Sequence, residues 1–316
     1  MNQRGPRVSI GLPVYNGEQF VAAALDALLA QTFRDFELII SDNGSTDRTE
    51  EICRSYAAKD PRVHYYRNAK NLGAAGNHNR VVALSTGELF MWFSHDDLCS
   101  PEYMQRCVEF LDQHPDYVLS YSRTGDIDAQ GNTLPRNNPH RRRAVSSEDL
   151  DTSAEKPSRR FRELIRMEHQ CEAIYAVMRA DILKKTPLHG HYADADRVVL
   201  AELGLYGRFH VIPQTLFFHR EHPARSVHTN PGRQERTVWM DPTKAGKIVL
   251  PHFRQFSELL AVVRRTPLPL RERLSCCRLM LRWLWVNRRR LFSDLEYSVL
   301  GLARKVLRRS DRATDS

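Results

Sequence analysis

Features of membrane-spanning, secreted and zinc-binding proteins are scarce in this sequence. No window holds 18 uninterrupted apolar residues, the length that a transmembrane helix needs. The N-terminus leads from Arg7 directly into Val8-Ser9-Ile10, without the apolar segment of a signal peptide. The six cysteines are scattered and form no C-x-x-C pair, which argues against a zinc site and a disulfide framework. We therefore expect a cytoplasmic protein.

The sequence also lacks the G-x-G-x-x-G fingerprint of dinucleotide-binding proteins. Its first apolar run, residues 8–14, is followed by Tyr15-Asn16-Gly17, where that fingerprint would place several glycines. A nicotinamide-dependent oxidoreductase is therefore a weak hypothesis. The sequence contains no recognised nucleic-acid-binding module and no internal repeat.

Acidic residues are outnumbered by basic ones, 38 Asp and Glu against 47 Lys and Arg, so the formal net charge is +9. Such a surplus favours an anionic partner: a nucleic acid, a phosphorylated substrate or an anionic membrane surface. The basic residues are concentrated in the insertion near residues 136–160 and in the C-terminal part, which argues against a nucleic-acid partner. With 41% hydrophobic and 27% charged residues, a chain of 316 residues can form one large globular domain or two.

Strands and helices are predicted to alternate through the first 120 residues. Apolar runs predict the strands, and apolar residues at helical spacing predict the helices between them. The strands are expected at 8–14, 36–41, 63–66, 89–93 and 118–121. The helices are expected at 20–29, 47–58, 74–84 (with Gly87 as its C-cap) and 101–113. This alternation predicts an α/β fold with a mostly parallel sheet and helices on both faces.

Polar loops follow four of these strands, and in a parallel sheet they meet at one edge, where ligands bind. They are residues 13–17, 42–47, 71–76 and 94–97. In the last of them, Asp96 and Asp97 follow a buried strand, and two carboxylates can ligate a divalent cation that bridges phosphates. The alternative role for such a pair is to cap the next helix. Together the loops indicate a nucleotide site.

The composition changes after this region. A hairpin tip is predicted around Asp128 and Gly131, and residues 136–160 are polar and basic, typical of either a functional lid or a disordered insertion. Further helices are expected at 161–167 and 197–206, and strands at 174–178 and 211–218. We divide the chain into a catalytic domain (1–228) with a polar insertion (122–160), a linker (229–244) and a basic amphipathic helical tail (245–316).

Several short motifs occur in a characteristic order: Pro13-Val14-Tyr15-Asn16, Ser41-Asp42-Asn43-Gly44-Ser45-Thr46-Asp47, Arg67 with Asn71-Leu72-Gly73 and Asn79-Arg80, Thr86-Gly87-Glu88, and His95-Asp96-Asp97. With these motifs, residues 8 to about 228 resemble the family 2 inverting glycosyltransferases. The resemblance implies the GT-A fold, a Rossmann-like, mostly parallel sheet, here with a C-terminal basic helical extension.

The resemblance also implies an activity and its partners. A sugar would pass from a nucleotide-diphosphate donor, a UDP-sugar, to a hydroxyl of a glycan or lipid-linked acceptor, with inversion, in surface polysaccharide biosynthesis. The cofactor would be a divalent metal, Mn²⁺ or Mg²⁺. The alternatives are a non-catalytic nucleotide-sugar-binding relative and a basic nucleic-acid-binding protein.

The family's residue roles map onto single positions of this chain. Asp96 and Asp97 resemble its metal- and ribose-contacting pair, although Ser94 stands where the family often has a third Asp. His222 resembles the late histidine that reaches the metal or the diphosphate, and Asp42 resembles the carboxylate that recognises the base. The other implied nucleotide contacts are Pro13, Val14, Tyr15, Asn16, Glu18, Arg67, Asn71 and Gly73.

An inverting enzyme needs a general base that takes the proton of the acceptor hydroxyl. The family places an acidic residue ahead of a helix that ends in glycine, and Asp196, ahead of Gly207, matches it. Asp194 is the competing candidate. A helix N-cap is the alternative role of Asp196.

The C-terminal part interleaves aromatic residues with arginines, which predicts amphipathic helices. Leu279, Trp283, Trp285 and Phe292 would either contact an anionic membrane or pack on the catalytic domain. On the first interpretation the protein is peripheral at the inner face of the membrane.

Overall fold

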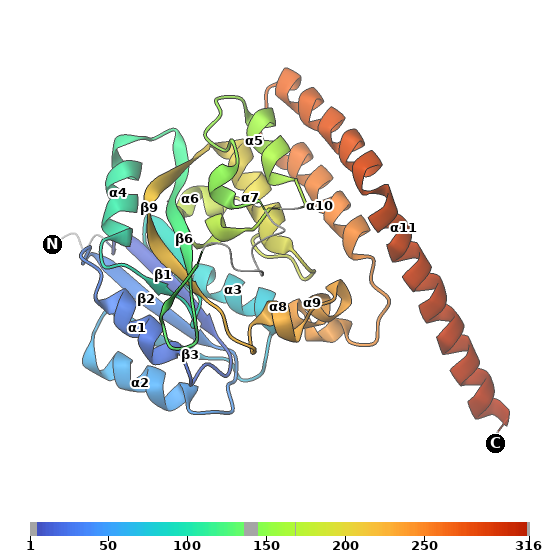
Figure 1. Ribbon diagram of the computed structural model, residues 1–316, viewed down its shortest axis with the longest axis horizontal. Helices are drawn as coiled ribbons and strands as arrows, with labels where there is room; N and C mark the ends of the chain where they lie inside the picture. Colours follow the sequence, from blue (N-terminus) through green and yellow to red (C-terminus); the bar gives the residue numbers. More distant parts are fainter. Residues whose placement is uncertain (1–4, 136–144, 168, 315–316) are drawn as a thin grey trace.

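The computed structural model describes residues 5–135, 145–167 and 169–314, with side-chain environments up to residue 298. In this part of the chain, the centre is a nine-stranded sheet in the order β3-β2-β1-β4-β8-β6-β9-β5, with β7 paired to β6 (Figure 1). The strands are β1 (Val8–Val14), β2 (Phe36–Asp42), β3 (Val63–Arg67), β4 (Leu89–Trp92), β5 (Leu98–Cys99), β6 (Tyr117–Ile127), β7 (Thr133–Leu134), β8 (Val177–Arg179) and β9 (Arg208–Arg220).

The N-terminal half of the sheet is parallel, as predicted. Strand β1 pairs in parallel with β2 and β4, and β2 pairs in parallel with β3. Every residue of β1 is buried, which is typical of a central parallel strand covered on both faces. The other half is mixed, because β8 runs antiparallel to both β4 and β6, while β6 and β9 are parallel.

Helices cover both faces of the sheet, and the side chains of β4 show the two faces. Phe90 and Trp92 pack with α3 (Gly73–Leu84) and α7 (Ala195–Tyr206), whereas Leu89, Met91 and Phe93 pack with α1 (Val21–Leu29) and α4 (Tyr103–Gln113). Successive strand residues point to opposite faces, so each face has its own hydrophobic core. Helix α2 (Thr49–Lys59) covers the face of α1.

Glycine 87 does not cap a helix, contrary to the prediction. Helix α3 ends at an extended Ser85, and Gly87 lies against β1 instead, where its N–H donates to Ser9 Oγ over 2.7 Å. A Cβ on Gly87 would come within 2.7 Å of the Ser9 nitrogen. Close packing of two backbones therefore explains the glycine at this position. In the sequence, such a glycine looks the same as one that ends a helix.

Part of the expected polar insertion is ordered and packed. The hairpin tip is confirmed, since Asp128 N donates to Asn132 O over 2.9 Å, but 136–144 lie outside the described residues. Helix α5 (Pro157–Leu164) begins four residues before the expected helix and buries Arg160. This guanidinium donates to the carbonyls of Gly204, Ala154 and Glu155, and those bonds make its burial tolerable.

Residues 172–179 also differ from the prediction of a strand at 174–178. Residues Glu172–Tyr175 form a short 3₁₀ helix, and only Val177–Arg179 pair as β8. The nearby helix α6 (Ala180–Leu183) continues directly from β8.

The segment expected to be a linker, 229–244, contains α9 (Arg233–Met240) and a 3₁₀ turn (Pro242–Lys244), after a short α8 (Ser226–Thr229). Helix α9 packs on α3 so closely that a Cβ on Gly73 would lie 2.4 Å from Met240 O. The sequence does not predict helix α9, because charged residues mask its amphipathic spacing.

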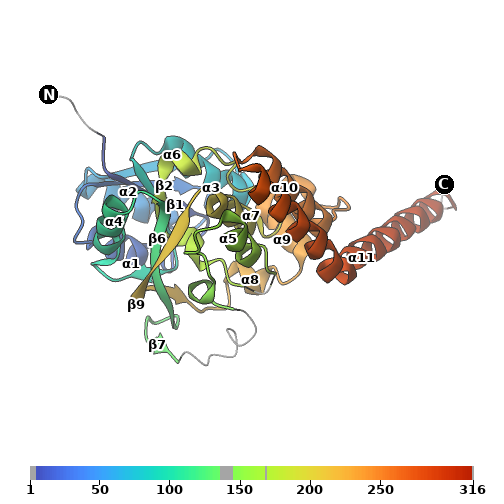
Figure 2. The same ribbon diagram turned by 90° about the horizontal axis from the view of Figure 1, so that it is seen from above.

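The C-terminal tail forms α10 (Pro251–Arg265) and the 45-residue α11 (Leu270–Thr314), which extends beyond the body of the molecule (Figure 2). Trp283 packs on the catalytic domain and donates from Nε1 to Ile165 O over 3.1 Å. Trp285 and Phe292 are exposed. One face of this helix therefore packs on the domain as expected, and the membrane contact expected of the exposed residues stays a prediction. Within the described residues, no helix is long and apolar enough to cross a bilayer.

Two glycines with positive φ give a matched test of the packing of α9. Gly73 has φ +78° and is crowded by Met240, whereas Gly246 has φ +70° and a Cβ added there would meet no atom within 4 Å. We expect Gly246→Ala to lower the free energy of unfolding by about 1 kcal/mol through backbone strain alone. Gly73→Ala should lower it by about 3 kcal/mol or more, because strain and a backbone clash add. Urea denaturation measures both, and equal losses would contradict the packing argument.

Candidate active site

The loops that follow β1 and β2 are joined by hydrogen bonds at the carboxyl edge of the sheet, as predicted. The backbone N–H of Asn16 donates to Ser45 Oγ over 2.9 Å, and Thr46 N donates to Asn16 Oδ1 over 2.9 Å. Glu18 is held in the same way, with its N–H on Asp47 Oδ2 and its carboxylate accepting from Arg48 N, both over 3.0 Å. The edge is therefore preorganised by its own polar side chains.

Pro13, Val14 and Tyr15 lie in this edge but differ in what they expose. Pro13 and Val14 are buried in β1, and Val14 O accepts from Asn43 N over 2.8 Å. Tyr15 is 45% exposed, so it is the member of the three whose side chain is free to contact a ligand.

Asp42 and Arg67 form the second part of the site, at the ends of β2 and β3. The Asp42 carboxylate is fully buried and accepts from Ser45 N, the Tyr65 hydroxyl and Arg67 Nη1 over 2.8, 2.6 and 2.7 Å. Burial and the hydrogen bond to Asp42 raise the pKa of Tyr65. An N–H of a nucleobase reaches Asp42 only if one of these bonds yields, whereas the Arg67 side chain remains one-third exposed.

Asparagines connect the third loop to the second. Asn43 Nδ2 donates to Asn71 Oδ1 over 2.9 Å, and Asn43 Oδ1 accepts from Leu72 N over 2.8 Å. Asn71 Oδ1 also accepts from Gly73 N over 2.8 Å. Asn71 and Gly73 are thus brought to the edge as predicted, where they shape the start of α3.

Asp96 pairs with His222, which comes from the end of the chain's catalytic part. His222 Nε2 lies 3.0 Å from Asp96 Oδ2, and the Ser94 hydroxyl donates to the other oxygen of Asp96. Burial raises the pKa of Asp96, but the nearby His95 charge and the bonds from His222 and Ser94 outweigh it, so the pKa is lowered overall. Asp96 is therefore an anion held ready beside a histidine.

Asp97 is used differently from Asp96. Its Oδ1 accepts from Arg220 N over 3.0 Å, and its Oδ2 lies 2.9 Å from His219 Nδ1. Burial lowers the pKa of His219, and the charge and hydrogen bond of Asp97 outweigh that effect and raise it. With both oxygens bound to β9 and 4% exposure, Asp97 joins two parts of the fold, and this geometry gives no support to its predicted role as a metal ligand.

The donor set fits a divalent cation only in part. Among the described residues, no group of three or more His, Cys, Asp and Glu side chains could hold a metal ion by itself. Asp96 offers carboxylate oxygens and His222 an imidazole, whose Nδ1 is buried without a partner. Mg²⁺ and Mn²⁺ commonly take one or two protein ligands and complete their shell with phosphate oxygens and water. The pair therefore suits a cation that arrives with a diphosphate.

A cavity of about 560 Å³ is lined by Asp196 and by His219, whose ring contacts Asp97 in the loop of residues 94–97, here called the acidic loop. Asp196 is the second residue of α7, after the N-cap Asp194, and accepts from Arg197 N over 2.8 Å through Oδ1. Burial and the charge of Asp194 raise its pKa, against the charge of Arg197 and hydrogen bonds from Arg197 and Cys171 that lower it. His219 is therefore the side chain that connects the cavity of Asp196 to the acidic loop.

Asp194, the competing candidate, is engaged by cations. It precedes α7 with φ +60°, forms an ion pair with Arg233, and lies 3.3 Å from Arg236 Nη1. Both arginines contact this carboxylate, whereas Asp196 forms no ion pair with a cation among the described residues. Asp196 therefore fits the role of base better than Asp194.

Several residues of the cavity are not predicted from the sequence. His78, Trp92 and His189 cluster at one wall, with ring centroids 5.1 Å apart for the two histidines and 4.9 Å for Trp92 and His189. Burial lowers the pKa of His78 to about 4 and that of His189 well below its usual value, so both rings are neutral. Trp239, on α9, is 41% exposed at the same cavity. None of these residues lies in a motif.

Arg220 is a further residue that sequence motifs alone do not explain. Its guanidinium donates to Asp96 O over 2.8 Å and to Ala129 O over 3.0 Å, and it stacks over Phe20 at 4.9 Å. It thereby ties the acidic loop to the β6–β7 hairpin. The signal in the sequence is its position between His219 and His222.

Comparison with known proteins finds a matching family and several relatives. The family model described as Glycosyl transferase family 2 matches residues 9–185, more than half of the chain. An uncharacterized glycosyltransferase of Rickettsia typhi is 35% identical over 153 residues, which are 48% of this chain and 46% of that protein. The chain spans about half the length of the curated relatives it matches.

Two solved structures share the architecture. Residues 1–349 of TarS from S. aureus, in complex with UDP-GlcNAc, give a TM-score of 0.61 at 15% identity, covering 93% of this chain and 81% of that one. The mannosyltransferase PcManGT from Pyrobaculum calidifontis, in complex with GDP-Man and Mn²⁺, gives 0.53 at 16% identity, covering 99% and 81%. The expected GT-A fold, with its mostly parallel sheet and C-terminal helical extension, is confirmed.

Variants of Asp96 and Asp97 should distinguish the roles of these two residues. Asp97→Asn should lower the free energy of unfolding by about 2 kcal/mol, because its amide nitrogen cannot accept from His219. Asp96→Asn should instead weaken stabilisation by UDP with Mn²⁺, with a smaller loss in stability. Urea denaturation and thermal shift measure these effects. If Asp97→Asn unfolds like the parent chain but loses Mn²⁺ binding, Asp97 is a metal ligand after all.

Proposed function

This chain belongs to glycosyl transferase family 2, and we propose that it is an inverting glycosyltransferase. It would move a sugar, a hexose, from a nucleotide-diphosphate donor to a hydroxyl of a glycan or lipid-linked acceptor. The observation that carries the proposal is that Asp196, about 100 residues from the acidic loop in the sequence, lines a cavity together with His219, which contacts Asp97 of that loop. A base on one side and diphosphate-binding groups on the other are the two requirements of this reaction.

The donor nucleotide would bind on the edge formed by the first three loops. The exposed ring of Tyr15 and the Arg67 guanidinium can contact a base, and Asp42 beneath Arg67 sets the position of that guanidinium. We propose uridine as the base, with Asp42 accepting from its N–H after a bond to Arg67 or Tyr65 opens.

The diphosphate would lie at Asp96 and His222. A divalent cation held by this pair would neutralise the negative charge that grows on the leaving diphosphate. Ser94 holds one oxygen of Asp96, and Arg220 fixes the backbone of the loop through Asp96 O, so the carboxylate is oriented before any ligand arrives. The nucleotide complexes of TarS and PcManGT support nucleotide-sugar binding by this fold.

Asp196 would act as the general base. In a single displacement, the acceptor oxygen attacks the anomeric carbon as the bond to the diphosphate breaks, and its proton passes to Asp196. The sugar then inverts, because attack and departure occur on opposite faces. The raised pKa of Asp196 makes it a better proton acceptor than an exposed aspartate.

The cavity is suited to sugars rather than to a large apolar ligand. Its volume of about 560 Å³ is lined by neutral His78 and His189, by the buried Trp92 and the exposed Trp239, and by Arg197, Arg225 and Arg236. Imidazole nitrogens bond to hydroxyls, and aromatic faces pack against sugar rings. His189 Nε2 is buried without a partner, so a hydroxyl placed there would satisfy it.

We infer the compartment from the cysteines. All six cysteines are free thiols, which fits a reducing compartment such as the cytosol. Surface polysaccharide biosynthesis is the pathway we propose. The alternative, a non-catalytic relative that only binds nucleotide-sugar, would keep the nucleotide edge and need no raised-pKa carboxylate in the cavity.

The variant Asp196→Asn tests the proposal against that alternative. We expect it to lower kcat by at least about a hundredfold, because a general base is lost, while binding of nucleotide is kept. Transfer from a UDP-sugar measures activity, and thermal shift with UDP, GDP, dTDP and CDP, each with Mn²⁺ or Mg²⁺, measures binding. Retained turnover would remove Asp196 from the mechanism, and no shift with any nucleotide would contradict the donor class.

The pH dependence gives a second test of the base. Asp196 must be ionised to accept a proton, so kcat/KM should fall as pH drops through its pKa, which lies above the ordinary aspartate value of about 3.9. Asp194→Asn removes a charge that raises this pKa, so the acid limb should move to lower pH. Asparagine tolerates the positive φ at this position. The exposed Asp181→Asn is the control, and an acid limb that does not move in Asp194→Asn would contradict the assignment.

A further inference from the structure

Helix α11 has one face that packs on the protein. Cys276, Met280, Trp283, Asn287 and Leu291 are buried, at intervals of four, three, four and four residues. This spacing is that of one helix face, and the face contacts α5 and α10. Packing on the catalytic part therefore accounts for this stripe of side chains.

A second apolar stripe on α11 is not covered by any described part of the chain. Leu270, Leu274, Leu281, Trp285 and Phe292 follow at intervals of four, seven, four and seven residues, so they lie along one line of the helix. Their exposed fractions are 72, 49, 68, 68 and 61%. Isolated exposed apolar residues are ordinary, but an ordered line of them over six turns is typical of an interaction surface.

Arginines flank this stripe. Arg271, Arg278, Arg282, Arg288 and Arg289 lie between or beside its members, and none of the five forms an ion pair with a residue that the structure describes. Arg288 instead lies over the exposed ring of Trp285 at 4.3 Å. Apolar side chains bordered by unpaired cations match the layered chemistry of a bilayer surface with anionic headgroups.

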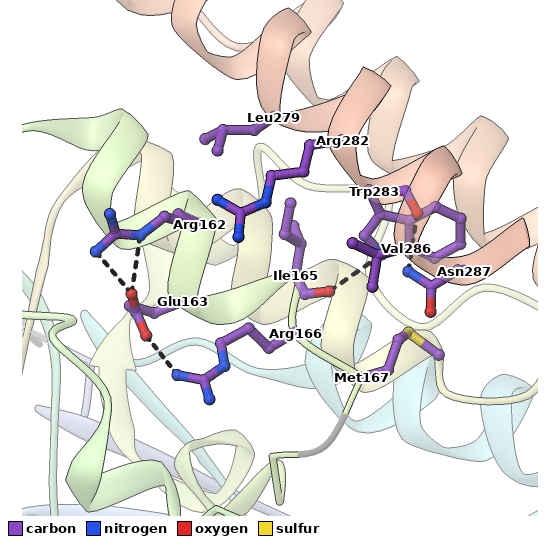
Figure 3. Close-up of a pocket in the computed structure, with 10 residues that line it drawn as sticks. All are labelled: Arg162, Glu163, Ile165, Arg166, Met167, Leu279, Arg282, Trp283, Val286 and Asn287. Atoms are coloured by element: carbon purple, nitrogen blue, oxygen red, sulfur yellow. Dashed lines mark hydrogen bonds and ion pairs between the residues drawn. The ribbon is translucent and has the colours of Figure 1, made fainter.

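A groove on the covered side of the same helix, lined by Trp283 and Asn287, adds positive charge to this part of the molecule. It has a volume of about 400 Å³ and lies between α5 and α11. Figure 3 shows Arg282 extending from α11 toward Arg162 and Ile165. Arg162 and Arg166 share Glu163, so three guanidinium groups face one carboxylate over an apolar wall that includes Val286. The groove therefore has a net positive charge.

We propose that the exposed stripe of α11 and its arginines dock this protein on an anionic phospholipid surface. Charge excludes a second copy of the chain as the better occupant, because pairing two such stripes would bring ten unpaired arginines together. The surface is separate from the transfer site, so this proposal does not depend on the proposed activity.

Co-sedimentation of the full chain with vesicles tests the proposal without any nucleotide. Vesicles of phosphatidylcholine with phosphatidylglycerol should bind it, and vesicles of phosphatidylcholine alone should bind it much less. The variant Arg278→Gln/Arg282→Gln/Arg289→Gln should weaken binding on the order of a hundredfold, about fivefold for each arginine. The variant Leu281→Ser/Trp285→Ser/Phe292→Ser should weaken it by at least that factor. Tyr66→Ser, an exposed apolar residue on β3, is the matched control and should bind like the parent chain.

Tryptophan fluorescence gives a second measurement at a single residue. Vesicles with brominated acyl chains should quench the emission of Trp285, so Trp285→Phe should lose most of the quenching, whereas Trp239→Phe, which replaces an exposed tryptophan far from α11 in sequence, should keep it. Equal binding to both kinds of vesicle, or unchanged binding by the serine variant, would overturn the proposal. So would concentration-dependent dimerisation that the serine variant abolishes, since it assigns the stripe to a second copy.

Discussion

The contacts of Asp97 with β9 hold the candidate active site together. The acidic loop follows β4, and His219 lies more than 120 residues later in the chain. A long segment must therefore fold back before Asp97 and His219 can meet. One buried carboxylate joins them, by accepting from the backbone of Arg220 and contacting the ring of His219. Because an unpaired buried carboxylate is costly, the fold and the site favour the same arrangement.

Asp96 and His222 depend on that junction. Arg220 extends it by donating to the backbone of the acidic loop and to the β6–β7 hairpin, and its side chain is itself buried. The carboxylate of Asp96 is then left with a hydroxyl and an imidazole as partners, both of which a cation can replace. Two adjacent aspartates that look alike in the sequence thus have different contacts: Asp97 is bound to β9, and Asp96 is bound only to side chains that a ligand could displace.

The cavity depends on packing that is distant in sequence. Helix α9 brings Trp239 and two arginines next to Asp194, and it is seated on α3 by the absence of a side chain at Gly73. The neutral histidines of the cavity come from α3 and from the loop before α7. The second half of the chain therefore decides the shape of the space in which Asp196 lies.

The sequence by itself determined the parallel half of the sheet and the loops at its edge. Strand β1 follows the predicted bounds and β2 differs by one residue, because unbroken apolar runs and helical periodicity are local signals. Tertiary structure alone decided the pairing of β9 with β6, the burial of Arg160, the packing of α9 and the different contacts of Asp96 and Asp97. Each of these is a contact between segments far apart in the chain, where the energy lies in the partner and not in the local pattern. The two faces of α11 show the same limit, since both are apolar in sequence and only packing distinguishes the covered one.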